Sequence, residues 1–310
     1  MISNEKTIRS LIKNKFQNHG QLNFKSELNC IPLKQYGNSY VFKSFNKVRI
    51  SGISGKLLVR TGNQLQIADE LANANLIKKP DGYYLKVTAY INKENYKQIE
   101  TNGKEIGLDF GIKTNITTSE GEKLDVSVEE SDRLKKLQRE LFRKVKGSNN
   151  RYKTIKKIQR EYQKLLNKKQ DKANKIVSKL KRYETIVIQD EQISNWHTSY
   201  GKTVQHSCMG LIKKKLKQLP QTIILDKWIP TTKWCPRCGT INKYITLNDR
   251  IYKCGCGYES DRDMHAANNM ITIKDLILTN ISVPMERREL TLEEFKTAVE
   301  DSNIFNKSER

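Results

Sequence analysis

The fold of this chain is decided at residues 105–112, which read Glu-Ile-Gly-Leu-Asp-Phe-Gly-Ile. A short apolar run that ends in glycine is typical of a buried strand followed by a turn. Strand and helix patterns alternate from here onward, with hairpin strands expected near 115–118 and 122–128 and further strands at 184–188 and 222–225. This order predicts an α/β layered domain.

The residues before this stretch have a different character. Short runs of alternating apolar and polar residues at 39–42, 56–60 and 82–88 are separated by turn residues. This pattern predicts a small antiparallel β-domain with a barrel-like arrangement of strands, and we assign it residues 1–100. Its first part includes a polar segment at 3–16 that is compatible with a helix.

The composition points to a polyanionic partner. Among 310 residues there are 57 Lys and Arg against 34 Asp and Glu, a formal net charge of +23. This is far beyond what solubility requires and makes nucleic acid the leading candidate. A membrane fits less well, because no apolar run approaches the roughly 18 residues of a spanning helix and no signal peptide opens the sequence. We expect a cytoplasmic protein.

Positive charge is concentrated at residues 133–182, where apolar residues recur at helical spacing around a break at 147–150. We predict a hairpin of two long helices. Lysine-rich helix faces are often merely solvated, but acids are nearly absent here, so a phosphate backbone explains the charge better. The candidate nucleic-acid-binding residues are Arg139, Arg143, Lys144, Lys153, Lys156, Lys157, Arg160 and Lys164.

The remaining segments complete the outline. A basic amphipathic helix is expected at 204–219, and another helix begins near Arg262. Residues 285–310 are charged and lack a sustained core pattern, so we expect a loosely held tail.

Four of the six cysteines have the spacing of a metal site. One pair encloses two residues and the other encloses one, and Gly255 and Gly257 relax the tighter turn. Four thiolates make a closed zinc site with a structural role, and free thiols are the alternative. Cys30 and Cys208 are expected to be ordinary buried thiols. The zinc ligands we predict are Cys235, Cys238, Cys254 and Cys256.

Two aspartates are candidates for a catalytic metal site. Asp109 lies at the end of the strand quoted above. An aspartate at a strand end commonly serves only to form the turn, which is the alternative to a metal-binding role. Asp261 can cap a helix whose face carries Asp263, Ala266 and Ala267, and the small alanines allow close packing on a sheet. A carboxylate on that seam is costly unless a cation meets it. Acids converging from a strand and a helix can hold two Mg²⁺ ions about 4 Å apart for phosphodiester hydrolysis.

These motifs together resemble TnpB, the OrfB protein of insertion sequences and a relative of type V CRISPR effector nucleases. The strand, the basic hairpin, the cysteines and the Asp261-Arg-Asp-Met-His-Ala-Ala-Asn run follow the order of that family. The resemblance implies an N-terminal oligonucleotide-binding β-barrel with a small helical recognition segment. It also implies a RuvC-like nuclease domain of RNase H fold at 101–230 and 258–284, with a zinc ribbon inserted at 231–257.

The resemblance further implies RNA-guided cleavage of DNA, with a guide RNA and a target DNA as partners and Mg²⁺ as the catalytic cofactor. By matching positions, Asp109 is the first acid and Asp263 the third. His265 stands where the family often has asparagine, and we expect it to have a packing role. Trp196, Trp228 and Trp234 could stack on bases, but core filling is the expected role of any one of them.

The chain departs from the family at the middle acid, because the glutamate position is Gln189, followed by Asp190 and Glu191. Side chains alternate along a strand, so Gln189 and Glu191 share a face while Asp190 points away. Two residues span only ~7 Å, and a glutamate could reach back over that distance. We favour Glu191 as the displaced ligand. The alternative is a nuclease-inactive, RNA-guided DNA-binding protein or repressor; a self-sufficient transposase fits less well, because no catalytic tyrosine motif is apparent.

Overall fold

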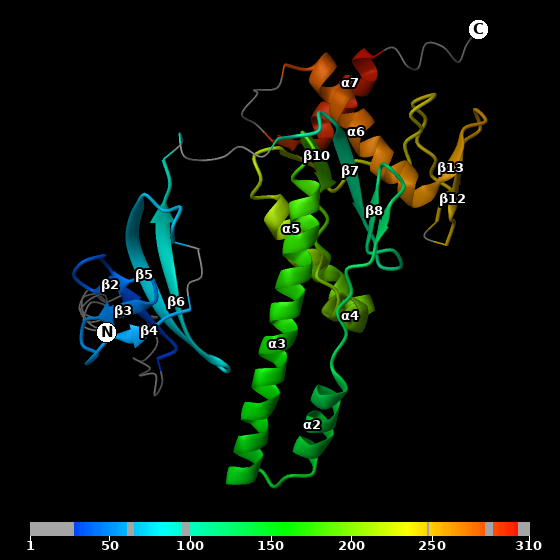
Figure 1. Cartoon of the computed structure of the whole chain (residues 1–310). Helices are drawn as coiled ribbons and strands as arrows, with labels where there is room; N and C mark the ends of the chain where they lie inside the picture. The colour runs from blue at the N-terminus through cyan, green and yellow to red at the C-terminus, as the bar shows by residue number, and fades with distance from the viewer. Residues whose placement is uncertain are drawn as a thin grey trace, which may run out of the picture. The chain divides into compact units, whose positions relative to one another are not determined.

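The computed structural model describes residues 28–60, 65–92, 94, 100–246, 248–282 and 288–302. The chain divides into two compact units, Met1–Lys97 and Gln98–Arg310 (Figure 1). The helix expected at 3–16 lies outside the described residues. Among the helices that are described, none is both long and apolar enough to cross a membrane.

The described strands of the first unit form two three-stranded antiparallel sheets around one small core. Tyr40, Val48 and Ala74 are buried in this core, and the Tyr40 hydroxyl donates to the carbonyl oxygen of Ala72 at 2.8 Å. The first sheet contains β1 (Cys30–Leu33), β5 (Glu70–Lys79) and β6 (Gly82–Tyr90), and the second contains β2 (Tyr40–Ser44), β3 (Lys47–Ile50) and β4 (Leu57–Leu58).

The β-character expected for this unit is therefore present. Closure into a barrel stays a prediction, because the described strands pair as two separate sheets. Cys30 was expected to be buried, but it lies exposed at the start of β1, whereas Cys208 in the second unit is buried. The expectation for Cys30 was wrong because the outer face of this sheet lacks a covering layer in the described residues.

The second unit is built on a six-stranded mixed sheet with the order β14-β11-β10-β7-β8-β9. The first four of these strands run parallel, and the β8–β9 hairpin adds antiparallel to β7. The strands are β7 (Glu105–Phe110), β8 (Ile116–Thr118), β9 (Lys123–Leu124), β10 (Thr185–Gln189), β11 (Thr222–Leu225) and β14 (Glu289–Leu290). The sheet thus has the layered α/β arrangement expected from the sequence.

Helices cover both faces of this sheet, and each face has its own core. Ile106, Leu108 and Phe110 of β7 pack with α3 and α5 on one face, while Val187 of β10 packs with α6 and α7 on the other. The alternation of side chains along β7 therefore turns Gly107 and Asp109 toward α6. The helices are α2 (Asp132–Phe142), α3 (Asn149–Leu180), α4 (His197–His206), α5 (Met209–Leu216), α6 (Arg262–Asn280) and α7 (Leu292–Asp301).

The basic hairpin is present, but its two arms are unequal. The first helix has 11 residues and the second has 32, so the expectation of two long helices was wrong for the first (Figure 1). Leu134, Leu137 and Ile158 form a small core between α2 and α3. Val145, in the turn between the helices, and Tyr152, near the start of α3, do not enter this core, because they are 76% and 53% exposed.

Two other expectations need correction. The helix predicted at 204–219 is two helices, α4 and α5, because the chain breaks helical pairing at Ser207 and Cys208 to bond with the segment after β9. Residues 285–310 were expected to form a loose tail. Instead, β14 adds to the sheet edge, and α7 buries Phe295 and Ala298 against α6.

Candidate active site and cysteine cluster

Asp109 lies at the C-terminal end of β7, on the face covered by α6. The close approach of these elements depends on Gly107, since a Cβ atom there would lie 2.0 Å from the carbonyl oxygen of Ala267 on α6. Ala266 and Ala267 are buried, as their small size predicted. This packing brings the start of α6 next to the end of β7.

Asp263 occupies the first turn of α6, where the helix dipole favours an anion. The predicted cap is confirmed, because the Asp261 side chain accepts from the backbone N–H groups of Asp263 and Met264 at 3.1 and 3.0 Å. Arg262 donates to Asp263 Oδ1 through Nη2 at 3.1 Å and through Nε at 3.3 Å. The carboxylate is thus fixed by the helix start and by one guanidinium group.

The three residues of the segment 189–191 each have different interaction partners. The Gln189 amide donates to the carbonyl oxygens of Asp226 and Ile229 at 3.1 and 2.7 Å, so it is fully engaged with the loop after β11. Asp190 forms an ion pair with Lys217. Glu191 Oε2 accepts from Lys213 Nζ at 2.8 Å.

The charges of Glu191 and Asp263 both act on Asp109. Burial raises the pKa of Asp109 well above its ordinary value, the negative charges of Glu191 and Asp263 raise it further, and Arg262 opposes them. Burial also raises the pKa of Glu191, with Lys213 opposing. A buried carboxylate under the influence of two further carboxylates is a place where a cation would be stabilised.

The carboxylates do not yet share one coordination sphere. In the described part of the chain, the four cysteines are the only group of three or more His, Cys, Asp or Glu residues whose ligand atoms all lie within 4.8 Å of one another. Glu191 and Asp263 instead contact Lys213 and Arg262. Carboxylate oxygens are ligands that Mg²⁺ prefers, and in this structure two protein cations balance the charge of two of these carboxylates.

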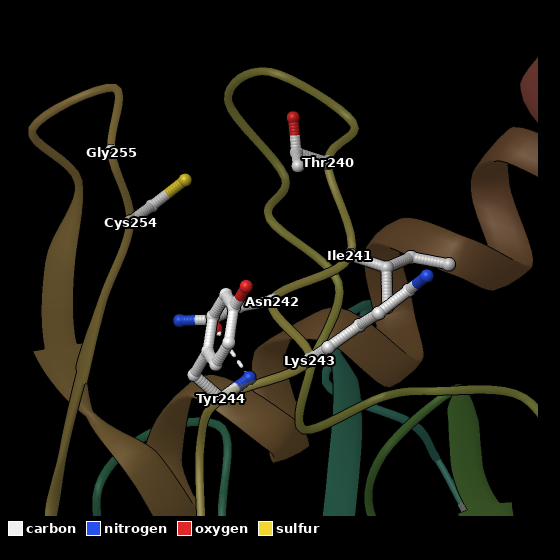
Figure 2. A pocket seen from close by; sticks show the side chains of 7 residues that line it. All are labelled: Thr240, Ile241, Asn242, Lys243, Tyr244, Cys254 and Gly255. Atoms are coloured by element: carbon white, nitrogen blue, oxygen red, sulfur yellow. Dashed lines mark hydrogen bonds between the residues drawn. The ribbon is translucent and has the colours of Figure 1, made fainter.

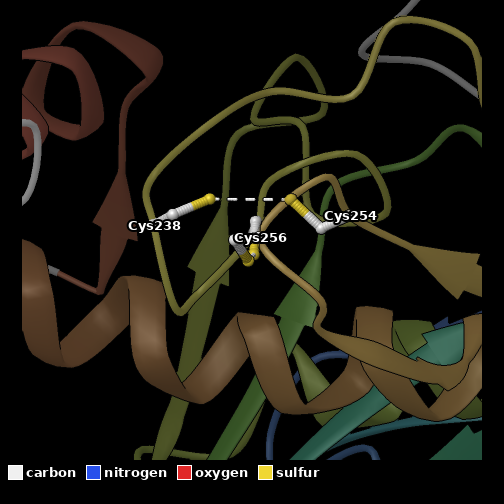
Figure 3. Close-up of side chains that lie close together, drawn as sticks. Cys238, Cys254 and Cys256 are labelled. Atoms are coloured by element: carbon white, nitrogen blue, oxygen red, sulfur yellow. Dashed lines mark hydrogen bonds between the residues drawn. The ribbon is translucent and has the colours of Figure 1, made fainter. Parts of the chain in front are cut away.

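The four predicted cysteines do converge, and Figure 3 shows three of them, Cys238, Cys254 and Cys256. Sγ of Cys235 lies 3.7 Å from Sγ of Cys256, and Sγ of Cys238 lies 3.5 Å from Sγ of Cys254. Tetrahedral zinc with Zn–S bonds of about 2.3 Å requires S···S distances of about 3.8 Å, so the residues fit this ion. Burial opposes ionisation of Cys238, but hydrogen bonds, first that with Thr240, lower its pKa to about 6.

The cysteines are carried by two turns and a short hairpin. Cys254 precedes a turn in which Gly257, with φ +84°, donates to its carbonyl oxygen at 3.0 Å, whereas Gly255 needs no left-handed conformation. The hairpin consists of β12 (Ile251–Lys253) and β13 (Glu259–Asp261), so it extends past the expected ribbon end at residue 257. β13 leads directly into α6, which couples the cysteine cluster to the position of Asp263.

A surface cavity of about 320 Å³ lies beside this cluster (Figure 2). Its lining includes Tyr244, which is 93% exposed, Lys243 and Gly255. The Tyr244 N–H donates to Asn242 Oδ1 at 2.9 Å, which fixes the loop that carries the ring. The sequence pattern did not single out Lys243 or Tyr244.

Comparison with known proteins links both halves of this site to one group of proteins. Residues 87–198 match the OrfB_IS605 family, described as "Probable transposase", and residues 210–270 match the "Cas12f1-like, TNB domain". Over residues 87–198 the chain is similar to the OrfB proteins. The OrfB match contains Asp109 and Glu191, while the TNB match contains Asp263 and all four cysteines.

Two curated relatives support the same grouping. A "Putative RNA-guided DNA endonuclease" of Streptomyces pristinaespiralis is 32% identical over 177 residues, which are 54% of this chain and 44% of that protein. The "Putative RNA-guided DNA endonuclease InsQ" of Escherichia coli (strain K12) is 25% identical over 248 residues, 71% of this chain and 61% of that protein. The OrfB-like chain thus spans about half the length of the curated relatives it matches.

The basic hairpin lies within the OrfB match. Seven of the eight predicted nucleic-acid-binding residues are exposed on it. Lys144 differs, because it is half-buried, pairs with Glu140 at 2.6 Å and donates to the Thr154 hydroxyl at 2.9 Å. We therefore correct the prediction for Lys144, whose ammonium group stabilises the hairpin turn.

A buried polar network, missed by sequence reasoning, connects the OrfB and TNB matches. Thr231 Oγ1 donates to Gln189 Oε1 at 2.8 Å, and Asn269 Nδ2 donates to the carbonyl oxygens of Thr231 and Trp234 at 2.7 Å each. Asn269 follows His265 by one helical turn, and its Nδ2 lies 3.0 Å from His265 Nε2. That i, i+4 spacing of polar residues on a buried helix face was the available signal.

His265 has the packing role predicted for it. It is fully buried and stacks on Tyr252 with ring centroids 3.8 Å apart, and burial lowers its pKa to about 4, so the ring is neutral at physiological pH. Trp234 is buried and Trp196 packs against the core, as expected. Trp228 is 69% exposed, so the core-filling expectation was wrong for this residue.

Proposed function

We propose that this OrfB-like chain is an RNA-guided DNA endonuclease of the RuvC type. The observation that carries the proposal is the buried carboxylate of Asp109 at the end of β7, on which the negative charges of Glu191 and Asp263 both act, because a bound cation would relieve this repulsion. The names of the two curated relatives support a guide RNA and a target DNA as partners. The net charge of +23 supports binding to both, and we place the protein in the cytoplasm with them.

In this proposal Asp109, Glu191 and Asp263 hold two Mg²⁺ ions. When bound, Mg²⁺ supplies an activated water molecule and stabilises the leaving 3′ oxygen. The protein's own part is positional: β7 fixes Asp109, the start of α6 fixes Asp263, and Gly107 lets the two elements approach. Arg262 and Lys213 balance the charge of the carboxylates until metal binds.

The other parts of the chain have supporting roles in the proposal. Zinc bound by the cysteine cluster holds the ribbon at 231–257, which precedes α6. The exposed residues of the basic hairpin at 133–182 contact the guide heteroduplex through its backbone, and the nuclease domain comprises 101–230 and 258–284. The unit at 1–100 is an oligonucleotide-binding barrel with a small recognition segment, and β14 and α7 support the sheet edge of the second unit.

The test is a cleavage assay with the full chain, its co-purified RNA and a DNA target that matches the RNA. We expect cutting in Mg²⁺ that disappears in EDTA and in Asp109→Ala, while target binding is retained. Tight binding by the wild-type chain without any cutting would support the nuclease-inactive alternative. The observation favouring that alternative is the spacing of the carboxylates, which exceeds that of a closed metal site.

A further inference from the structure

A buried lysine, Lys213, contacts Glu191 of the proposed acidic site, although the proposed reaction does not require a lysine there. Lys213 lies on α5 between Ile212 and Leu216, which pack into the core, and it is only 5% exposed. A buried ammonium group is costly unless it is paired. Its Nζ donates to two atoms of one residue, the backbone carbonyl oxygen of Glu191 at 2.5 Å and Glu191 Oε2 at 2.8 Å.

These two hydrogen bonds hold Glu191 at a position where strand pairing no longer fixes the backbone. β10 ends at Gln189, and the last backbone bond to the neighbouring strand runs from Asp190 N to Leu225 O at 2.8 Å. Glu191 lies beyond that ladder, so strand pairing does not set its direction. Lys213 fixes both the backbone and the carboxylate of Glu191, and its Nζ is kept in place 5.5 Å from the centroid of the Phe110 ring on β7.

We propose that Lys213 is a positioning residue that holds the Glu191 carboxylate toward Asp109 and so makes Glu191 the middle ligand of the site. The inference rests on the proposed function for its effect on cleavage. Its effect on metal binding does not depend on a guide RNA or a target. Loss of such a supporting partner typically reduces metal affinity or activity by about 10- to 100-fold.

The same helix end provides a matched control. Lys217 follows Lys213 by one helical turn and pairs with Asp190, the residue next to Glu191. Its side chain is 37% exposed and that of Asp190 is 48% exposed, so this pair is solvated and contributes little. The two lysines thus offer the same chemistry on neighbouring acids, and only one of them contacts the carboxylate that influences Asp109.

The experiment compares Lys213→Met, Lys213→Arg and Lys217→Met in the full chain. Methionine keeps the length and packing of the buried stem, and thermal unfolding checks that each variant is folded. Mn²⁺ is titrated by calorimetry, and the signal from the acidic site is defined as the part lost in Asp109→Ala. We expect Lys213→Met to weaken this binding by about tenfold or more, Lys213→Arg to restore part of it, and Lys217→Met to leave it within about twofold.

A double-mutant cycle tests whether Lys213 acts through Glu191. In a Glu191→Gln background, Lys213→Met should cause little further loss of Mn²⁺ affinity. Equal or tighter binding in Lys213→Met would overturn the proposal, because Lys213 would then be only a competitor of the metal. A wild-type chain that binds Mn²⁺ but does not cut DNA would overturn the proposed function and leave the assignment of Lys213 standing.

Discussion

Replacing Gly107 with alanine would force apart the two elements that carry the first and third acids. The added methyl group would lie 2.0 Å from the backbone oxygen of Ala267, whereas Cβ contacts below 3.0 Å essentially do not occur. Because this oxygen belongs to a helix backbone, no side-chain rotation relieves the contact, and β7 and α6 must separate by about 1 Å. Overpacking of this kind costs about 1–3 kcal/mol in the free energy of unfolding.

The same displacement would separate Asp109 from Asp263, and a misplacement of about 1 Å in a catalytic site can reduce the rate about 100-fold. Urea denaturation and the rate of guide-matched DNA cleavage in Mg²⁺ measure the two effects. Gly210→Ala is the control, since Gly210 lies on α5 with nothing within 4 Å of an added Cβ, and alanine should stabilise that helix by up to about 1 kcal/mol. A Gly107→Ala variant with wild-type stability and wild-type cleavage would refute this reasoning.

Three further predictions concern the metal, the charge and the basic surface. Chelation should release about one Zn²⁺ per chain and lower the unfolding temperature, and Cys256→Ser should lower the zinc content measured by mass spectrometry; a zinc-free wild type would contradict this. Burial and the neighbouring acids raise the pKa of Asp109, so its ionised form destabilises the folded state above the unfolded pKa of about 3.9. Asp109→Asn should therefore raise the urea midpoint at pH 7.5 in EDTA, and the gain should vanish as the pH falls toward about 4; a gain independent of pH would count against it. Lys153→Ala and Lys157→Ala should each reduce the slope of log affinity for nucleic acid against log salt by roughly 1, whereas Lys144→Ala, whose ammonium group is engaged within the hairpin, should leave the slope unchanged.

The core of the second unit could be predicted from local patterns. The apolar run ending at Asp109 is a central strand, and the Asp261 cap with the alanines that follow it is the start of a helix packed on that strand. The cysteine spacing likewise predicted a cluster that the structure brings together. These features depend on residues close in sequence, whose period and capping chemistry are visible without the fold.

The features that were missed depend on contacts between distant segments. The helix at 204–219 divides because Cys208 N donates to Val126 O and Val128 N donates to His206 O, at 2.9 and 2.6 Å. No local pattern near residue 208 reports these partners. The C-terminal helix α7 is different, since Thr291 and Glu294 form a capping box that the sequence did display.

The middle acid shows the limit of strand alternation. The alternation of side chains along β10 puts Gln189 on the α6 side of the sheet. Because β10 ends at Gln189, alternation alone does not determine where the Glu191 side chain points. Its direction comes from Lys213, a residue 22 positions away on another element. The sequence therefore suggested Glu191 as a metal ligand, but it did not show which residue would hold the Glu191 carboxylate in position.

The most direct test of the nuclease account is the cleavage rate of Glu191→Gln beside that of Asp190→Asn, each measured with bound RNA, matched DNA and Mg²⁺. The account predicts that the wild type and Asp190→Asn cut the target at similar rates and that Glu191→Gln binds it without cutting. Undiminished cleavage by Glu191→Gln would contradict the account.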